Sequence, residues 1–599
     1  MNHRSASAFS NYYNAIRHLT REQCVTRIVR SLERIVTRLR GDGAHRSLLR
    51  KAKRCAAGTF LADEQLQQRL LHLAYWRIRT KPNAWNASQP EDWRFLNQPL
   101  NIGFPPRWNA PVVDQSASDS RLWHFHLHYF DWIWDFLQQG RNLLSVRVME
   151  NWLWRNRLGS KKCHRAAWSS YTVSLRIRNW AVAIALLKKR RKISPISLRV
   201  IEDGLWAQTI FLCDHLEKEH GGNHLLENLI ALAFVTRCFD GTGARNLRRR
   251  ADRMLRAQLA TQLTPSGCHE EQSPMYQTII LDRLIDLVGV LAPDDPAGKW
   301  IRDAASRMNR FLCHLLMPDG NFPLLGDSTR SASVKLWAMR ARASKLLGER
   351  LTQPESGYSQ RDGYHVFRNM KAGDYVLFDA APLGVDSLGA HMHADILGFE
   401  VILGDVAIVA DGGAGVYRAG PERTELRSAR EHAGLVVDGW ACAEPWKSFR
   451  MGRRGKVLQH KGREVADGFE AVASHDGFSP AGVMHTRRVS FDATAGIVTV
   501  RDRLDGKTPR RRVEVEMRIP LHHAVSARRT LENGWAILDK SSGKVAEIVI
   551  ESTPSPLRFG EEIGMYYPAF GISLKRTVLR VSCELASGSE LVYTIRRAT

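Results

Sequence analysis

The chain has 599 residues, of which 44% are hydrophobic and 25% charged, a composition typical of a folded protein with more than one domain. Its 87 Lys and Arg residues outnumber its 61 Asp and Glu residues, and the formal net charge is +26. That excess favours a polyanionic partner, which could be nucleic acid, anionic lipid or an acidic polysaccharide. The basic residues are spread along the chain, and neither zinc-finger spacing nor a Gly-rich phosphate loop is present. A nucleic-acid partner is therefore not expected.

Nine cysteines are scattered singly, so structural disulfides are not indicated. Residues Met1 to Asn14 lack the apolar core of about 7 to 15 residues that a secretory signal needs. No run of about 18 apolar residues is present either, so the sequence predicts no transmembrane segment. Localisation and oligomeric state stay open at this point.

Residues 1–95 are interpreted as a basic N-terminal helical extension. Ile28, Leu32, Ile35 and Leu39 follow one another at spacings of four, three and four among many arginines, which predicts an amphipathic helix. We favour a helix docked on the main domain, with attachment to a membrane surface as the alternative. The prolines between Pro99 and Pro111 indicate a linker or an extended lead-in.

Residues 96–350 are interpreted as a domain of successive helices, joined by short turns that contain Gly, Asn or Pro. Such a succession of antiparallel helices suggests an α/α barrel or toroid. Two sets of apolar residues illustrate the helical spacing: Val173, Ile177, Trp180, Ile184 and Leu187, then Ile280, Leu284, Leu287 and Leu291.

Residues 351–599 change to a pattern of alternation, which predicts a β-sandwich of antiparallel strands with Gly and Asp turns. The clearest expected strands are 364–368, 375–379, 496–500, 513–517 and 591–595. Close to the change of pattern, His391, His393 and Asp395 bring two imidazoles and a carboxylate into five residues. We therefore expect a functional site at the junction of the two domains.

The chain resembles the heparinase II/III family of polysaccharide lyases from about Trp123 to Arg488. Six strings in the family's order carry the resemblance: 123–132, 171–176, 222–225, 273–276, 318–320 and 391–395. The resemblance implies an incomplete (α/α) toroid followed by an antiparallel β-sandwich. It also implies cleavage of a uronic-acid-containing polysaccharide by β-elimination in the cleft between them.

Eliminating a 4-linked uronide requires removal of the C5 proton next to a carboxylate, which is feasible only when that carboxylate is neutralised. By similarity, Asn223 and His391 are assigned to the carboxylate and Tyr276 to base and acid catalysis. We expect cationic groups in a basic cleft to lower the pKa of the Tyr276 phenol.

Four further residues are candidates for substrate binding: His126, His224, Glu271 and Arg450. His126 lies between His124 and His128, and packing roles are expected for two of these three. Arg423, Arg427 and Arg430, and Arg453 and Arg454 beside Arg450, offer further cations for an acidic chain.

The resemblance also implies a zinc site formed by His393, Asp411 and His432, with His393 at a strand start and Asp395 in a supporting position. This zinc is interpreted as structural. The chain departs from the family in having Ala433 and Gly434 after His432, which removes two side-chain donors beside the ligand.

Two alternatives to a lyase remain. One is a catalytically silent glycan-binding or exopolysaccharide-assembly protein on the same fold, motivated by those departures. The other is a basic scaffold for nucleic acid or an anionic membrane, motivated by net charge alone. The sequence leaves open which uronic-acid polysaccharide would be the substrate, and only the family suggests the periplasm or cell envelope.

Overall fold

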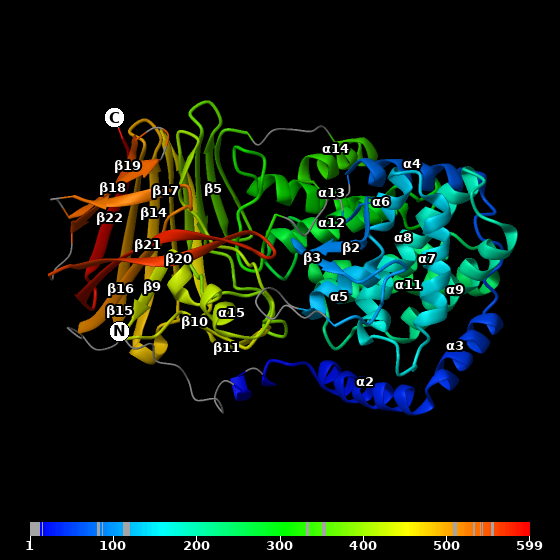
Figure 1. Cartoon of the computed structure of the whole chain (residues 1–599). Coiled ribbons are helices and arrows are strands. Elements are labelled where there is room, and N and C mark those ends of the chain that lie inside the picture. Colours follow the sequence, from blue (N-terminus) through cyan, green and yellow to red (C-terminus); the bar gives the residue numbers. More distant parts are fainter. Residues whose placement is uncertain are drawn as a thin grey trace.

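The protein is described from a computed structural model, in which the helical half and the strand-rich half lie side by side (Figure 1). The structure describes residues 12–14, 16–80, 84–86, 88–111, 120–330, 335–349, 355–506, 512–530, 533–539, 541, 543–552 and 556–598. Most of the segment considered as a signal peptide and the expected domain boundary at 350 and 351 lie outside these residues.

The N-terminal part begins with α2 (Arg21–Arg40), α3 (Asp42–Arg54) and α4 (Glu64–Thr80). The amphipathic helix expected from the sequence is α2, and Thr20 and Gln23 form a capping box at its start. The prediction that the helical extension continues to residue 95 is wrong. After α4 the chain forms a small antiparallel sheet of β1 (Trp85–Asn86), β2 (Gln89–Phe95) and β3 (Gln98–Asn101). Buried and exposed side chains alternate at the end of β2, where Trp93 and Phe95 point inward. The Trp93 ring lies 4.8 Å from that of Trp132.

The helical half has an inner and an outer layer, as expected for a toroid. The inner helices α8 (Ser170–Lys189), α10 (Gly222–Thr236) and α12 (Pro274–Val288) are buried along nearly their whole length, because their sequences are apolar on most sides. The arginine-rich α11 (Thr242–Gln262) buries one face only. The other helices of this half are α5 (Ser120–Tyr129), α6 (Ile133–Gln138), α7 (Asn142–Arg155), α9 (Pro195–Asp214), α13 (Gly298–Leu315) and α14 (Leu336–Leu347).

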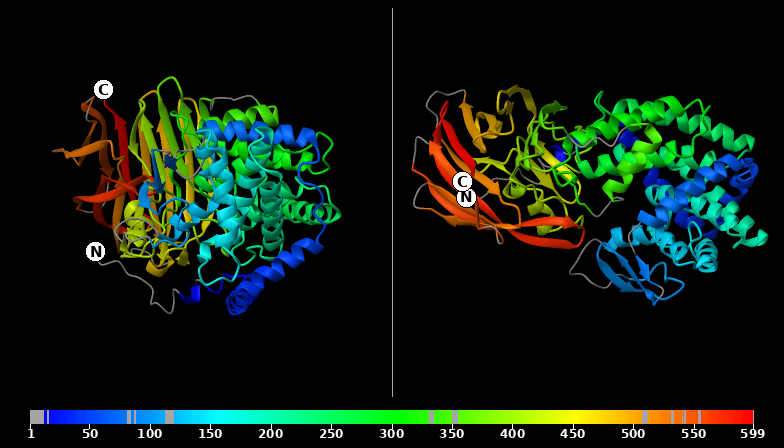
Figure 2. Two further views of the ribbon diagram at one scale, coloured as in Figure 1. Left: turned by 45° about the vertical axis from the view of Figure 1, so that its right-hand side comes forward. Right: turned by 90° about the horizontal axis from the view of Figure 1, so that it is seen from above.

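The strand-rich half consists of packed antiparallel sheets, as the alternation predicted (Figure 2). The sheet next to the helices has the order β4 (Gly357–Arg361), β5 (Tyr364–Asn369), β6 (Asp374–Asp379), β7 (Phe399–Leu403) and β8 (Val406–Val409). A second sheet has the order β12 (Val457–Val465), β13 (Gly468–His475), β14 (Val483–Asp492), β15 (Ile497–Gly506), β22 (Glu590–Arg597), β19 (Gly543–Ser552), β18 (Gly534–Asp539) and β17 (Val525–Arg529). A third has the order β20 (Arg558–Ala569), β21 (Ile572–Ala586), β16 (Arg512–Pro520) and β9 (Gly434–Val437).

Short elements complete the half that carries the site. They are the hairpin of β10 (Ala443–Trp446) and β11 (Arg450–Arg454), and the short helix α15 (Pro421–Leu426). Every strand expected from the sequence is present, and β14 alternates between buried and less buried positions along its length. The chain therefore has the toroid and β-sandwich architecture that the sequence predicted.

The two halves share a small core, so their relative position is fixed by packing. On the sheet side, Tyr364 packs 5.9 Å from Phe311 of α13, and Arg368 donates from Nε to the Leu316 carbonyl at 2.7 Å. The Tyr375 hydroxyl donates to the Leu315 carbonyl at 3.1 Å. These contacts fix the position of the loops of one half relative to the loops of the other. None of the helices that the structure describes has both the length and the hydropathy to cross a membrane.

Candidate functional site

A single carboxylate, Asp327, lies at the centre of the junction. It follows α13 in a loop, and both of its oxygens accept hydrogen bonds from the Arg423 guanidinium of α15, at 2.6 and 2.7 Å. His391 Nδ1 lies 2.9 Å from one oxygen, and His393 Nε2 lies 2.9 Å from the other. Burial opposes the charged form, but Arg423 and the two histidines outweigh it and hold the pKa of Asp327 well below its usual range.

Asn223, at the start of α10, is bound to the carboxylate of Glu271. Its amide Nδ2 donates to both Glu271 oxygens at 2.9 and 2.8 Å, and its backbone N–H donates to one of them at 2.7 Å. The preceding residue must be glycine, because Gly222 has φ +47° and a Cβ there would lie 2.1 Å from Glu271 Oε1. Asn223 and Glu271 are therefore held together closely.

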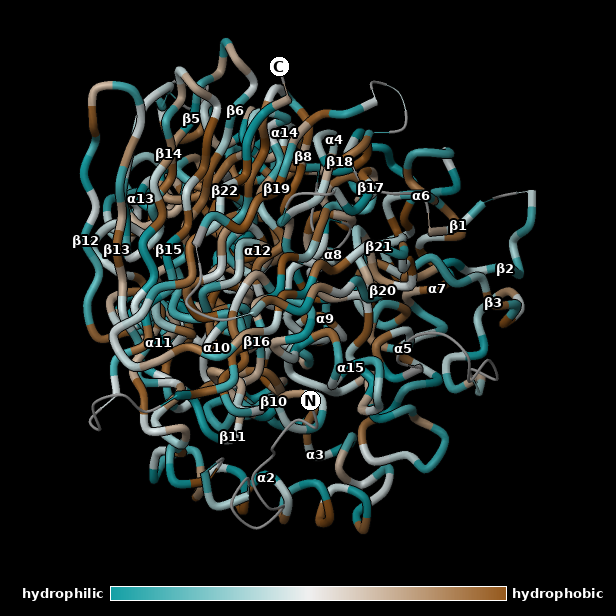
Figure 3. The backbone as a smooth tube through the Cα atoms, turned by 90° about the vertical axis from the view of Figure 1, so that its left-hand side faces the viewer, coloured by the Kyte–Doolittle hydropathy of each residue, from teal (hydrophilic) through white to brown (hydrophobic). Residues whose placement is uncertain are grey.

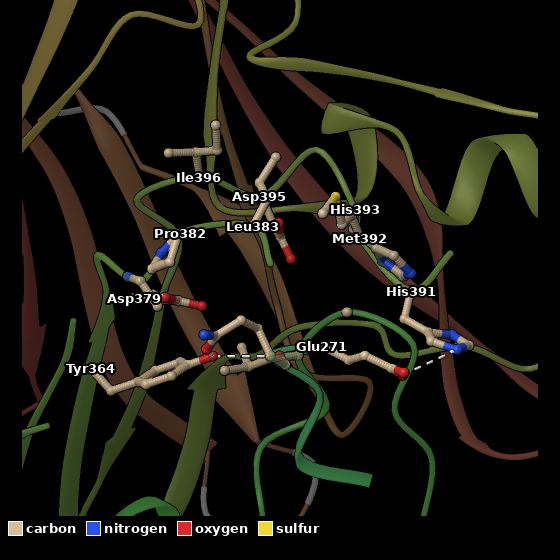
Figure 4. A pocket seen from close by; sticks show the side chains of 14 residues that line it. Glu271, Tyr364, Asp379, Pro382, Leu383, His391, Met392, His393, Asp395 and Ile396 are labelled. Atoms are coloured by element: carbon tan, nitrogen blue, oxygen red, sulfur yellow. Dashed lines mark hydrogen bonds and ion pairs between the residues drawn. The ribbon is translucent and has the colours of Figure 1, made fainter. Parts of the chain in front are cut away.

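The same Glu271 carboxylate faces His391, whose Nε2 lies 3.4 Å from Glu271 Oε2 (Figure 4). Burial raises the pKa of Glu271, but the neighbouring His391 and His269 and the hydrogen bonds from Asn223 outweigh it and lower the pKa overall. The Asn223 amide and the His391 imidazole thus flank one carboxylate. In this structure the carboxylate between them is the Glu271 side chain.

Tyr276 lies one turn into α12, behind Pro274 and the N-cap residue Ser273. Its ring centroid lies 4.0 Å from that of His391, and its hydroxyl lies 3.0 Å from the hydroxyl of Tyr417, a residue of the strand-rich half. Asn223 and His391 therefore face Glu271, whereas Tyr276 lies against His391 and Tyr417.

The expected direction of the Tyr276 pKa is wrong. Burial, followed by the neighbouring Tyr417 and Asp327, raises the pKa of the Tyr276 phenol well above its usual value. The nearby Arg423 guanidinium is paired with the Asp327 carboxylate and does not offset these effects on Tyr276.

A pocket lies beside these residues and is lined by Glu271, His391, His393, Asp379 and Asp395, among others (Figure 4). Burial raises the pKa of Asp395 to about 6 and that of Asp379 well above its usual range. Asn223 and Tyr276 do not line this pocket. The pocket therefore lies on the side of the cluster formed by His393 and Asp395.

A metal ion could be held by His393, Asp395 and His432, which offer ligand atoms within 4.8 Å of one another. His393 Nδ1 and His432 Nε2 are both buried without a hydrogen-bond partner, and their other ring nitrogens bind Asp327 and Asp411. Two imidazole nitrogens and a carboxylate are a donor set that suits zinc. The residues present therefore fit such an ion.

The membership of this group differs from the sequence-based assignment. Asp395, expected in a supporting position, belongs to the group, whereas Asp411 lies behind His432 with its Oδ2 2.7 Å from Nδ1. His393 lies in a loop before β7 and not at a strand start. Asp411 follows β8, and His432 precedes β9.

The other candidates for substrate binding have different partners. His224 Nδ1 lies 3.3 Å from Glu217, and its ring lies 4.7 Å from that of Tyr171. His126 packs 5.0 Å from Tyr129, while its neighbours His124 and His128 are buried. None of these side chains lines the pocket beside Glu271.

The arginines expected to offer free cations are mostly engaged. Arg423 and Arg427 are fully buried, and Arg427 donates to the backbone carbonyls of Met392 and Gly389. Arg450 Cζ lies 5.3 Å from the Trp446 ring and 5.5 Å from that of Tyr12. The expectation that Arg423 and Arg427 would bind an acidic chain is therefore wrong, because both are used to build the loop that carries the histidines.

Two residues of the site were missed by the sequence analysis. Asp327 is an isolated acid in a loop, and nothing in its neighbourhood distinguishes it from a surface carboxylate. Tyr417 follows a run of glycines and alanines after β8, where an aromatic residue normally indicates packing.

Comparison with known proteins gives matches along most of the chain. Residues 141–349 match the family described as heparinase II/III N-terminus, and residues 354–593 match the family described as heparinase II/III-like, C-terminal. A protein of Caulobacter vibrioides named FtsZ-localized protein C is 22% identical over 425 residues, covering 68% of this chain and 70% of that protein.

Solved structures with similar folds include two lyases of this kind. One is heparinase III, with a TM-score of 0.67 and 16% identity, covering 93% of this chain and 89% of that one. The other is a mutant of the heparan sulfate lyase HepC from Pedobacter heparinus, with a TM-score of 0.60 and 18% identity, covering 93% and 88%. At these identities the likeness shows the shared fold.

Replacing Asp327 by Asn should destabilise the protein strongly, because Arg423 then keeps a buried charge without its partner. We expect a loss of about 3–5 kcal/mol in the free energy of unfolding, measured by denaturant titration. The pKa of Asp327 is lower in the folded protein, so its contribution is complete above its unfolded pKa of about 3.9 and is lost as the pH falls below that value. The difference between the two proteins should therefore shrink in acid.

The control is Glu470→Gln, which removes the carboxylate of an exposed pair with Arg463 and should cost less than about 1 kcal/mol. An Asp327→Asn protein as stable at neutral pH as this control would contradict the role of Asp327.

Proposed function

Because the chain belongs to the heparinase II/III-like family, a family of polysaccharide lyases, we propose that it cleaves an anionic uronic-acid-containing polysaccharide by β-elimination. One observation carries the proposal. Asn223 from the toroid and His391 from the strand-rich half flank the buried Glu271 carboxylate, and the Tyr276 ring lies 4.0 Å from the His391 ring. An amide, an imidazole and a phenol around a carboxylate are the groups that uronate elimination requires.

The Glu271 carboxylate indicates how the substrate would bind. It has the charge and shape of a uronate carboxylate, and the Asn223 amide and His391 Nε2 already face it. A uronate that takes the place of Glu271, or shares its donors, would have its own charge offset by the same two groups. Neutralisation of that charge makes the C5 proton removable.

Tyr276 is proposed to move the proton. Its phenolate would take the proton from C5, the C5–H electrons would form the C4=C5 double bond, and the C4–O4 bond would break towards oxygen. The proton would then pass from Tyr276 to O4 of the leaving sugar. The Tyr417 hydroxyl lies 3.0 Å away, and together with burial it raises the pKa of Tyr276, so the free protein holds this residue as the phenol.

The metal site is proposed to hold a structural zinc ion through His393, Asp395 and His432. When bound, the ion would supply a fixed positive charge and a rigid link between the histidine loop and the segment before β9. His391 lies two residues from His393, and both bind Asp327, so the loop that carries His391 would gain most of that rigidity.

A catalytically silent glycan-binding or assembly protein is the second candidate. The observation that favours it is that the Asn223 amide donates to both oxygens of Glu271, so this amide is engaged in the resting structure. The Caulobacter vibrioides relative is named for its localisation with FtsZ and not for an enzymatic activity.

The Tyr276→Phe protein should form 4,5-unsaturated uronide product at least about 10²-fold more slowly than the unchanged protein, since it retains the ring but has no group to move the proton. The measurement is the ultraviolet absorbance of the product over a panel of acidic polysaccharides. Tyr358→Phe, which removes a phenol bonded to His365 on the far side of the first sheet, is the matched control and should keep full activity.

Equal rates for Tyr276→Phe and the unchanged protein would disprove the role of Tyr276. Binding of an acidic glycan without product formation, in the unchanged protein as well, would establish the silent alternative.

Metal analysis of the purified protein should find about one zinc per chain, and removal by a chelator should lower the melting temperature, because a structural ion stabilises only the folded state. His432→Ala should lose the metal, whereas His224→Ala, at a half-buried position beside Glu217, should keep it. A His432→Ala protein with unchanged metal content would refute the site.

A further inference from the structure

The helix α2 exposes an unusual amount of apolar surface. Eleven of the 22 large apolar side chains that are strongly exposed among the described residues lie between Tyr12 and Leu49. Seven of them belong to α2, with exposed fractions from 44% for Val29 to 82% for Leu39. At 100° per residue they fall within an arc of about 120° on one face of the helix. The seven are Val25, Ile28, Val29, Leu32, Ile35, Val36 and Leu39.

The opposite, polar face of α2 is the one that contacts the rest of the protein. Gln23 is buried and donates to the Ser387 carbonyl at 3.3 Å. Arg30 donates to the carbonyls of Asp214 and Leu216 at 3.0 and 3.1 Å. The helix lies at the edge of the molecule, apart from the toroid helices (Figure 1), and apolar segments recur along it (Figure 3). An amphipathic helix on a globular domain normally buries its apolar face, so α2 is oriented the opposite way.

The helix also carries positive charge, and Arg21 and Arg40 lie within or beside the arc of its apolar side chains. The helix contains six arginines and two glutamates, and both glutamates are paired, Glu22 with Lys218 and Glu33 with Arg30. The adjoining α3 adds more exposed basic residues. The exposed basic side chains of the two helices include Arg21, Arg27, Arg34, Arg38, Arg40, Arg46, Arg50, Lys53 and Arg54.

We propose that α2 is an in-plane docking helix for an anionic phospholipid bilayer. The seven apolar side chains would enter the boundary between headgroups and acyl chains, and Arg21 and Arg40 would contact lipid phosphates. The structure already holds the helix by its polar face, so docking requires no rearrangement. This inference is independent of the proposed lyase activity.

A second copy of the chain fits the same face less well. Two α2 helices packed face to face would bring their arginines together, and the two acidic side chains that could pair with them are already used within one chain. An anionic bilayer supplies both the apolar interior and the negative charge that this face lacks. Charge complementarity therefore favours the bilayer.

The test is flotation of the full-length protein with vesicles of phosphatidylcholine and phosphatidylglycerol at 3:1, and with vesicles of phosphatidylcholine alone. We expect binding to the anionic vesicles, weaker binding to the neutral ones, and a decrease with added salt. Replacing Ile28 and Leu32 together by Glu should weaken binding to the anionic vesicles by at least about tenfold. The change places two negative charges on the helix face that would enter the anionic bilayer. Because both side chains are exposed, the double variant should fold normally, which circular dichroism checks.

Ile563→Glu is the matched control. Ile563 on β20 is 74% exposed, and its replacement should leave vesicle binding within about twofold of the unchanged protein. A second variant, Arg21→Glu with Arg40→Glu, replaces two exposed arginines within or beside the apolar arc and should weaken binding to anionic vesicles only.

Equal binding of the unchanged protein and the Ile28→Glu, Leu32→Glu protein to anionic vesicles would overturn the proposal. So would a lack of vesicle binding in a protein that light scattering shows to be dimeric and that the same double variant converts to a monomer.

Discussion

The whole site depends on one buried ion pair between Asp327 and Arg423. The pair joins a loop of the helical half to the short helix α15 of the strand-rich half, and His391 and His393 bind the two oxygens of the same carboxylate. Each histidine thereby has one nitrogen fixed. The remaining nitrogen of His391 faces Glu271, and that of His393 is left for the metal group. One carboxylate thus positions both the expected catalytic histidine and a ligand of the candidate metal site, which explains why two functions can share a stretch of five residues.

The sequence predicted the architecture well, because apolar periodicity and strand alternation report burial directly. The helix α8 and the strands β5, β6, β15, β16 and β22 lie where their patterns place them. The small sheet of β1 to β3 was missed, since only Trp93 and Phe95 alternate among polar and proline residues. The amphipathic α2 was predicted. Periodicity shows that a helix has an apolar face, but it does not show whether that face turns towards the protein or towards solvent.

The site was predictable where short strings carry the chemistry and unpredictable where contacts are long-range. Asn223, Tyr276 and His391 come together as expected. Which carboxylate reaches His393 and His432 depends on loop geometry, and Asp395 takes the place that spacing gave to Asp411. The pKa of Tyr276 was misjudged because net charge averages over the whole surface, whereas a buried phenol responds to burial and to its nearest neighbours, Tyr417 and Asp327.

The position of Glu271 connects the resting structure with the proposed reaction. Its carboxylate occupies the donors that a uronate would need, so the site is built for a carboxylate and filled by one at the same time. The most direct measurement is a crystal structure of the Tyr276→Phe protein with a glucuronate-containing oligosaccharide. We predict that the uronate carboxylate contacts the Asn223 amide and His391 Nε2, with Glu271 displaced and C5 facing the ring of residue 276. A sugar bound elsewhere, with Glu271 still on Asn223, would contradict the account.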